Sequence, residues 1–188
     1  VETLCCDWLR MADEIQLTDE YWMQFAYEQA AIAASKQEIP VGAVIVSQNQ
    51  IIGAGYNAPI SLSDPTAHAE VQALRQACLN LNNYRLPEDS VLYVTLEPCT
   101  MCVGALIHAR IAKVVFGATE PKAGSLVSAR KLFETGYYNH QFDIEAGCLN
   151  EQCSKQLSDF FKMRREQKRL QKLQEKSLND QNNSSISM

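Results

Sequence analysis

The 188-residue sequence lacks long apolar runs, an excess of positive charge and an even set of regularly spaced cysteines. No stretch of eighteen consecutive apolar residues occurs, so the sequence predicts no membrane-spanning helix. The first 17 residues include four acidic side chains and no long apolar segment, so we expect no secretory signal there. The seven cysteines are irregularly spaced, unlike those of a small secreted disulfide protein, which predicts a reducing, cytoplasmic setting.

Positive charge is concentrated near the C-terminus. The formal net charge of −5 argues against a general nucleic-acid binder. Eight of the 17 Lys and Arg residues nevertheless lie between Lys155 and Lys176, which makes this segment a basic patch in an otherwise acidic chain. The patch is either a surface for an anionic partner or a solvated helix face, and charge alone leaves both open.

Hydrophobic spacing and turn residues predict helices that alternate with strands. Helices are expected from a cap at Thr18 to the residues before Pro40, and over residues 65–81, 98–110, 126–135 and 150–177. Strands are expected over residues 41–47, 50–56, 91–96, 113–117 and 141–145. This order predicts a three-layer α/β/α fold, with helices on both faces of a five-stranded mixed sheet.

The same criteria divide the chain into three parts. Residues 1–17 are expected to form an N-terminal extension without regular structure, in which residues 1–10 make few contacts. Residues 18–166 form the predicted domain, including the first part of the C-terminal helix. Residues 167–188 are expected to hold the basic end of that helix and, from residue 178, a polar disordered tail.

Two cysteines form a C-x-x-C motif where a helix is predicted to begin. Cys99 and Cys102 are three residues apart, so their thiols share one helix face. The N-terminal end of a helix also lowers the pKa of a thiol through its dipole and its free N–H groups. Two thiolates placed in this way suit Zn²⁺, although the same motif is also typical of redox proteins and occurs incidentally.

A histidine and a glutamate stand at the start of the preceding predicted helix. A lone histidine is more often structural than a ligand, but His68 with the two cysteines makes three ligands and leaves a fourth position open, as in catalytic zinc sites. Cys148 and Cys153 are the alternative that would close a four-ligand structural site. On an ideal helix, residues i and i+2 point about 200° apart, so His68 and Glu70 meet only if the helix end faces the site.

The combination H-x-E followed by P-C-x-x-C is the signature of zinc deaminases. In these enzymes zinc lowers the pKa of its water to about 7, and a glutamate transfers protons while a ring carbon loses its exocyclic amine. One alternative is a deaminase of a free base or nucleoside such as guanine, which would not need the basic C-terminal helix. Another is a non-catalytic zinc-binding RNA module, against which Glu70 argues.

Six segments between Tyr21 and Arg165 resemble the bacterial tRNA adenosine deaminases of the TadA family. They are EIPVGAVIV (38–46), the region of Asn57, DPTAHAEVQALR (64–75), LYVTLEPCTMCVGALIHARI (92–111), VVFGA (114–118) and LSDFFKMRR (157–165). The motif around His68 is shared with guanine and other base deaminases. The longer cysteine motif and the LSDFFKMRR segment are similar to those of the tRNA enzymes.

The resemblance implies a cytidine deaminase-like homodimer that converts adenosine to inosine at the wobble position, typically of an arginine tRNA. It implies one Zn²⁺ per subunit, held by His68, Cys99 and Cys102. Glu70 would then be the proton shuttle for a zinc-activated water that attacks the adenine ring carbon. The implied contacts to the tRNA anticodon loop come from Asn57, Ala69, Glu120, Phe160, Arg164 and Arg165.

Some of these substrate contacts have a second interpretation. From the residues alone, Asn57 is equally typical of a turn after a strand, and Phe160 or Phe161 of a core stripe. The sequence also departs from the family at Glu120, where members usually carry Asp, and in the loop 121–125, which is shorter than in some members. These departures leave the zinc residues unchanged but bear on the nucleotide contacts.

Overall fold

The structure is a computed structural model that describes residues 17–186 and gives side-chain positions up to Lys176. Residues 1–16 and 187–188 lie outside the described part of the chain, and with them the prediction for residues 1–10. The helices are α1 (Asp19–Ser35), α2 (Pro59–Leu62), α3 (Ala69–Leu81), α4 (Thr100–Ala109), the 3₁₀ helix η1 (Leu132–Thr135) and α5 (Asn150–Ile186). The strands are β1 (Gly42–Ser47), β2 (Gln50–Tyr56), β3 (Val91–Leu96), β4 (Lys113–Ala118) and β5 (Asp143–Ala146).

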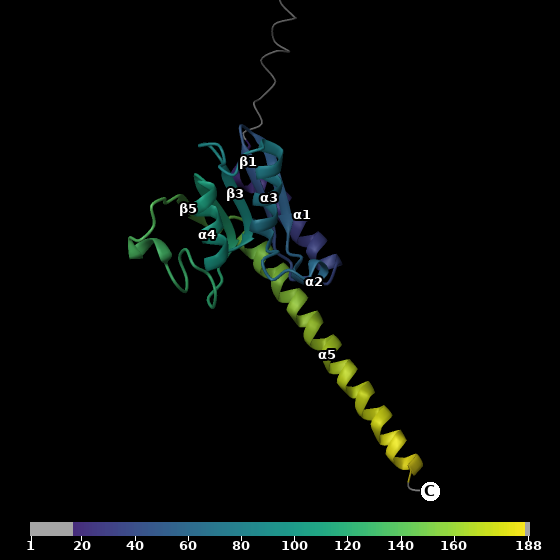
Figure 1. Cartoon of the computed structure of the whole chain (residues 1–188). Helices are drawn as coiled ribbons and strands as arrows, with labels where there is room; N and C mark the ends of the chain where they lie inside the picture. The colour runs from purple at the N-terminus through teal and green to yellow at the C-terminus, as the bar shows by residue number, and fades with distance from the viewer. Residues whose placement is uncertain (1–16, 187–188) are drawn as a thin grey trace, which may run out of the picture.

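The five strands form one mixed sheet in the order β2-β1-β3-β4-β5 (Figure 1). Strand β1 pairs antiparallel with β2 and with β3, whereas β3, β4 and β5 pair in parallel. The parallel half places the carboxyl ends of β3 and β4 side by side. Sheets of this kind bind ligands beyond the carboxyl ends of their strands.

Helices cover both faces of the sheet because alternate residues of each strand point in opposite directions. On β1, Ala43 and Ile45 belong to a core cluster that includes side chains of α3 and α4. Val44 and Val46 belong to a second cluster with Trp22 and other residues of α1. The predicted three-layer fold is therefore confirmed.

Two predicted helix starts are wrong. The helix expected from residue 65 begins at Ala69, because residues 64–66 form a turn in which Asp64 Oδ1 accepts a hydrogen bond from the Thr66 N–H at 2.8 Å. The short helix α2 was not predicted. Of the helix expected over residues 126–135, only residues 132–135 are helical, as the 3₁₀ helix η1, whereas residues 126–128 form turns around a buried glutamate described below.

Helix α5 packs on the sheet at its beginning and then leaves it (Figure 1). Cys153 and Phe160 are buried and Leu157 is half-buried, and these positions share one helix face. A Cβ at Gly117 would lie 2.6 Å from the Cys153 Sγ, so glycine lets α5 approach β4 closely. From Phe161 to Lys176 every side chain is exposed.

Helix α5 continues to Ile186, past residue 178, from which a polar disordered tail is expected. Propagation of a helix adds a hydrogen bond for each residue fixed and is much less costly than starting one. A long helix already anchored on the sheet therefore extends into a polar sequence. None of the helices in residues 17–186 is both long enough and apolar enough to cross a membrane.

Candidate metal centre and substrate pocket

The structure brings the three predicted zinc ligands together at the starts of two helices. His68 is the N-cap of α3, Cys99 is the N-cap of α4, and Cys102 lies in the first turn of α4. The His68 Nδ1 lies 3.7 Å from the Cys99 Sγ and 3.6 Å from the Cys102 Sγ, and the two sulfur atoms are 3.7 Å apart.

These distances fit zinc. A tetrahedral ion with Zn–S bonds of about 2.3 Å and Zn–N bonds of about 2.0 Å separates its ligand atoms by about 3.6–3.8 Å. His68, Cys99 and Cys102 are the group of possible metal ligands that stands out within the described residues. Cys153, the alternative fourth ligand, packs against Gly117 instead, and Cys148 packs against the core cluster at α1.

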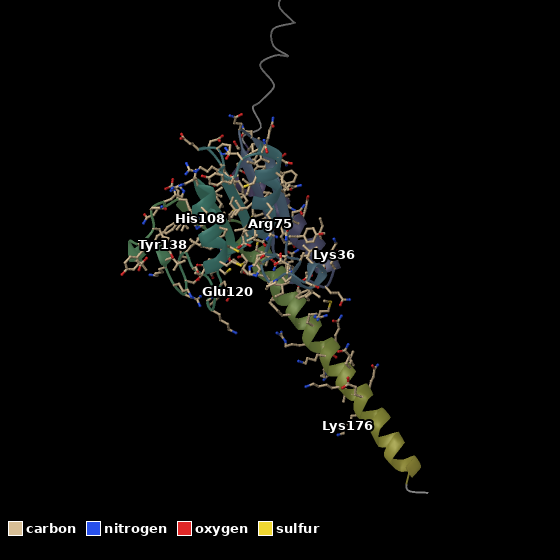
Figure 2. The ribbon with its side chains drawn as sticks, viewed as in Figure 1. Lys36, Arg75, His108, Glu120, Tyr138 and Lys176 are labelled. Carbon is tan, nitrogen blue, oxygen red and sulfur yellow. The ribbon has the colours of Figure 1, made fainter. Side chains whose placement is uncertain are left out.

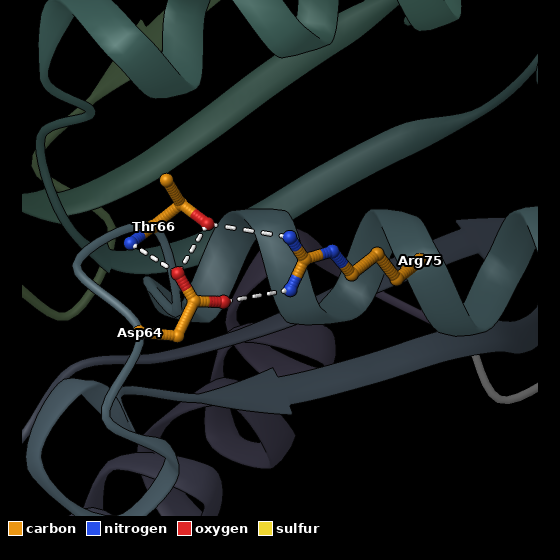
Figure 3. A network of polar contacts seen from close by, with 3 residues as sticks. All are labelled: Asp64, Thr66 and Arg75. Carbon is orange, nitrogen blue, oxygen red and sulfur yellow. Dashed lines mark hydrogen bonds and ion pairs between the residues drawn. The ribbon is translucent and has the colours of Figure 1, made fainter.

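Hydrogen bonds hold the loop before His68 (Figure 3). Asp64 Oδ1 accepts from the backbone N–H of Thr66 at 2.8 Å and from its hydroxyl at 2.7 Å. The Arg75 guanidinium, on α3, donates to Asp64 Oδ2 and to the Thr66 hydroxyl, both at 3.2 Å. The hydrogen bonds from Thr66 hold the pKa of Asp64 below its usual range. The loop is thereby tied to the same helix that His68 caps.

Asn57 also fixes the start of α3. Its Oδ1 accepts a hydrogen bond from the Ala69 N–H at 3.0 Å, and its side chain is buried at the edge of the pocket. The Ala69 N–H is thus engaged by Asn57, and Ala69 is not among the pocket-lining residues. Asn57 lines the pocket, and its contact with a substrate stays a prediction.

Glu70 lies in the same pocket as the metal ligands and is only 4% exposed. His68 precedes the helix with extended backbone angles (φ −75°, ψ 153°), whereas Glu70 is in the first turn. The two side chains are therefore not related by the i, i+2 angle of a helix, and both reach the pocket. Burial raises the pKa of Glu70, as expected of a proton-transferring carboxyl group.

The two cysteines have opposite pKa shifts. Hydrogen bonds with Cys102 and His68 lower the pKa of Cys99 to about 4, whereas the hydrogen bond with Cys99 and burial raise the pKa of Cys102. The hydrogen bond with Cys99 in turn raises the pKa of His68. Zinc supplies the positive charge that allows both sulfur atoms to be thiolates together.

A buried carboxylate that the sequence analysis missed organises the opposite wall of the pocket. Glu97 Oε1 accepts hydrogen bonds from the backbone N–H groups of Leu126 (3.0 Å), Val127 (2.8 Å) and Ser128 (3.0 Å). Its Oε2 accepts from the Glu120 N–H at 3.1 Å and from the Ser128 hydroxyl. Residues 126–128 form turns around this carboxylate, where a helix is predicted from residue 126.

Glu97 also joins this loop to the metal site. Burial acts to raise the pKa of Glu97, but hydrogen bonds from Ser128 and from three backbone N–H groups outweigh it and lower the pKa. A Cβ at Gly124 would lie 2.4 Å from Glu97 Oε2, so only glycine fits there. Gly124 also forms an isolated β-bridge with Cys99, and the Ser125 N–H donates to the Pro98 carbonyl at 3.0 Å. The sequence offered one indication of this role: Glu97 is an acidic residue at the end of a predicted buried strand, and a buried carboxylate needs several hydrogen-bond donors.

The pocket has a volume of about 560 Å³, within the range of small-molecule sites. Most of its surface is apolar, and its polar side chains are Asn57, His68, Glu70, Glu97, Cys99, Glu120, Thr119, Ser154 and Ser158. They come from the residues after β2, β3 and β4, from the starts of α3 and α4, and from α5. The pocket therefore combines the metal centre with a polar rim and a helical wall.

The residue of α5 that reaches the pocket is not the phenylalanine that was expected. Phe161 lines the pocket, whereas Phe160 is 7% exposed and lies by Tyr27 and Met163. The structure thus brings Phe161, and not Phe160, to the site, because the buried stripe of α5 ends at Phe160. Glu120 lines the pocket, and its Oε1 accepts a hydrogen bond from the Lys122 N–H.

The two arginines of the LSDFFKMRR segment are exposed and lie beyond the pocket rim. The Arg164 guanidinium donates a hydrogen bond to the Gln37 side chain at 3.3 Å. Their role in RNA contact stays a prediction.

Comparison with known families defines the class. Residues 16–118 match the family described as "Cytidine and deoxycytidylate deaminase zinc-binding region", and this match contains His68, Glu70 and both cysteines. The fold and the metal centre agree with that assignment. The class is that of the zinc-dependent deaminases.

Individual relatives narrow the class. The tRNA-specific adenosine deaminase of Haemophilus influenzae is 50% identical over 163 residues, which are 86% of this chain and 94% of that protein. A solved structure from work on A-to-I editing by tRNA:A34 deaminases at the wobble position is 38% identical, with a TM-score of 0.70 over 73% of this chain and 99% of that one. Guanine deaminase from Bacillus subtilis is 36% identical, with a TM-score of 0.52 over 65% of this chain and 72% of that one. The chain belongs to the family of tRNA-specific adenosine deaminases.

Proposed function

We propose that the protein hydrolyses the adenine amino group of a tRNA wobble adenosine, typically in an arginine tRNA, and leaves inosine. The single observation that carries the proposal is that His68, Cys99 and Cys102 converge beside the buried Glu70 in one pocket. The family of tRNA-specific adenosine deaminases supports the choice of substrate. Water is consumed, the bond from the ring carbon to the amino nitrogen breaks, and ammonia leaves.

His68, Cys99 and Cys102 would hold one zinc ion per subunit. When bound, zinc lowers the pKa of water to about 7 and so supplies a nucleophile at neutral pH. Glu70 would take a proton from the attacking water and deliver it to a ring nitrogen, and it would then move the proton of the added hydroxyl group to the departing amine. Burial raises the pKa of Glu70, and this favours the role, because a carboxyl group with a raised pKa accepts a proton more readily.

Asn57, Phe161 and Glu97 position the base. Because Asn57 Oδ1 is engaged by Ala69, Asn57 presents its amide nitrogen, a donor suited to an acceptor nitrogen of the purine. Phe161 supplies an aromatic surface at the pocket mouth on which a base or its neighbour stacks. Glu97 holds the opposite wall, including Glu120, at a fixed distance from Cys99.

The proposed partner is the anticodon loop of a tRNA. A base enters such a pocket only when it is extruded from its stack, and this costs a few kcal/mol, least in a single-stranded loop. The basic part of α5 begins beside the pocket and attracts phosphates. The cytoplasmic setting expected from the cysteine pattern belongs to the same proposal.

We also propose a homodimer formed through the outer face of α4. Met101 on this face is 36% exposed, and nothing in the described residues lies within 4 Å of the place where a Cβ on Gly104 would stand. The face is thus free to receive a second copy of the chain. Sedimentation of wild type and of Met101→Asp tests this: the variant should become monomeric, and an unchanged dimer would place the interface elsewhere.

The second candidate is a deaminase of free guanine, which the similarity to the Bacillus subtilis enzyme favours. The test incubates the zinc-loaded protein with arginine tRNA, with its anticodon stem-loop, and with free guanine. Inosine at the wobble position, with no turnover of guanine, is the expected result. Turnover of guanine with no inosine in the RNA would overturn the proposal.

A further inference from the structure

The pocket-facing side of α5 continues along the helix as a row of positive charge. Ser154, Leu157, Ser158 and Phe161 all line the pocket, so they mark the helix face that looks toward it. Residues three and four apart lie on one face of a helix. Steps of four, three, four and four from Phe161 reach Arg165, Lys168, Lys172 and Lys176, which we call the basic row.

The rest of the projecting helix differs from the basic row. The row contains no acidic residue, and all four of its side chains are exposed. At 100° per residue, Gln167, Gln171 and Gln174 point about 100° or more from the mean direction of the row. Of the two acids among residues 162–176, Glu166 lies away from the row and pairs with Arg169 at 3.1 Å, whereas Glu175, three residues after Lys172, borders the row. Positive charge is thus gathered on the side of the helix that carries on from the pocket.

The basic row extends well past the pocket. From Phe161 to Lys176 the helix rises by about 22 Å at about 1.5 Å per residue. Figure 2 shows Glu120 near the beginning of α5 and Lys176 far along the part of the helix that projects from the domain. When one base of an RNA occupies the pocket, the far part of the row can therefore contact only nucleotides that lie at some distance from that base.

We propose that the basic row binds the sugar-phosphate backbone of the double-stranded stem that adjoins the substrate loop. This inference rests on the proposed function, since the loop in the pocket sets where the stem begins. Exposed lysines suit phosphates and carry no sequence information, and double-stranded RNA is bound through its backbone and shape. The row thus selects a loop carried on a stem of sufficient length.

The test compares three forms of the zinc-loaded protein. The row variant is Lys168→Gln/Lys172→Gln/Lys176→Gln. The charge-restored variant adds Gln167→Lys/Gln171→Lys/Gln174→Lys, which returns the net charge to that of wild type on a different side of the helix. Helix content by circular dichroism checks that α5 is intact in each. The probes are one anticodon loop on a short stem and the same loop on a full stem, each titrated at several salt concentrations.

The expected effect is confined to the long-stem RNA. The row variant should bind it at least about tenfold more weakly at low salt, with a salt slope smaller by about 2 to 3, while kcat stays near that of wild type. The short-stem RNA should lose little affinity. The charge-restored variant should stay as weak as the row variant, because its charges point away from the stem.

Three results would overturn the inference. Recovery of affinity in the charge-restored variant would show that net charge alone matters. An equal loss of affinity for the short-stem and the long-stem RNA would show that the row binds the loop and not the stem. A change in sedimentation of the row variant without RNA would show that the row joins two protein chains. Failure of the proposed function is separate: wild type would form no inosine on either RNA, while the binding titrations would still measure the row.

Discussion

The pocket and the projecting part of α5 are built on opposite principles. In the pocket, Glu70 and Glu97 are buried; burial raises the pKa of Glu70, and fixed hydrogen-bond donors lower the pKa of Glu97. Along α5 beyond Phe160, every described side chain is exposed to water. Buried interactions are screened little by salt, whereas exposed charges are screened strongly. Changes in the pocket should therefore alter metal content and kcat, and changes on the helix should alter affinity in a salt-dependent way.

The largest effect within the pocket should come from its metal ligands. His68→Ala, Cys99→Ala or Cys102→Ala should each lower the zinc content well below one per chain and abolish deamination, because two remaining ligands hold zinc poorly. Metal analysis of the purified proteins measures this. Cys153→Ala is the matched control, since that thiol packs on Gly117 and should leave zinc unchanged. A ligand variant as zinc-loaded as wild type would remove that residue from the site.

Glu97→Gln should give the next largest effect. The amide replaces one acceptor oxygen with a donor that faces the N–H of Glu120, so the loop loosens and folding stability falls by about 1–3 kcal/mol. The control is Glu120→Gln, which lines the same pocket but leaves these backbone bonds intact. Equal stability and activity in the two variants would mean that Glu97 does not hold the wall.

The same substitution tests the pH dependence of stability. The folded pKa of Glu97 is lowered, so its contribution is present above the unfolded carboxyl pKa and is lost as the pH falls through the folded pKa. Thermal midpoints of wild type should therefore fall more steeply on acidification than those of Glu97→Gln. Parallel curves for the two proteins would contradict the assignment.

The adjacent residues Phe160 and Phe161 belong to different parts of the molecule: Phe160 anchors α5, and Phe161 lines the pocket. Phe160→Ala removes a buried ring and should lower stability by about 3 kcal/mol. Phe161→Ala removes an exposed ring at the pocket and should lower kcat/KM for the RNA about tenfold, with little effect on stability. Denaturant unfolding and kinetics on both variants give the comparison. A loss of stability in Phe161→Ala, together with a loss of kcat/KM alone in Phe160→Ala, would show that the buried face of α5 does not anchor the helix as described.

The smallest effect should come from Arg75 at the loop before His68. Arg75→Gln removes two exposed contacts, while the bonds between Asp64 and Thr66 remain. Because exposed ion pairs contribute little, kcat/KM should change by less than about fivefold. Asp64→Ala removes three of the four bonds, all except the one from Arg75 to the Thr66 hydroxyl, and should have the larger effect on the thermal midpoint. If Arg75→Gln lowered the thermal midpoint and kcat/KM more than Asp64→Ala did, the ion pair, and not the turn, would position His68.

Local patterns in the sequence were sufficient for much of the fold and for the metal ligands. The strand Val91–Leu96 and the N-cap at Thr18 were predicted correctly, because an apolar β-branched run and a capping residue are local signals. His68 and Cys99 were identified because their residue types and order carry the chemistry. Their convergence depends on β2 and β3, which run in the same direction on either side of β1 and so end at the same edge of the sheet. The order of elements predicted a mixed sheet but not this strand order.

Long-range contacts account for what was not predicted. The sequence does not show that Glu97 accepts hydrogen bonds from the N–H groups of Leu126, Val127 and Ser128, where the chain forms turns rather than the predicted helix. The choice between Phe160 and Phe161 depends on how α5 is rotated on β4, which the packing of Cys153 against Gly117 settles in the structure. Helical spacing alone allowed either ring to be buried.

The most direct test of the central claim is the zinc content and the deamination rate of Glu70→Gln, measured on the same sample. The account predicts about one zinc per chain, as in wild type, with inosine formation on the anticodon stem-loop reduced by a factor of about 10² to 10⁴. Zinc loss would instead make Glu70 a metal ligand. A retained rate would show that another group carries the protons, and either result would contradict the account.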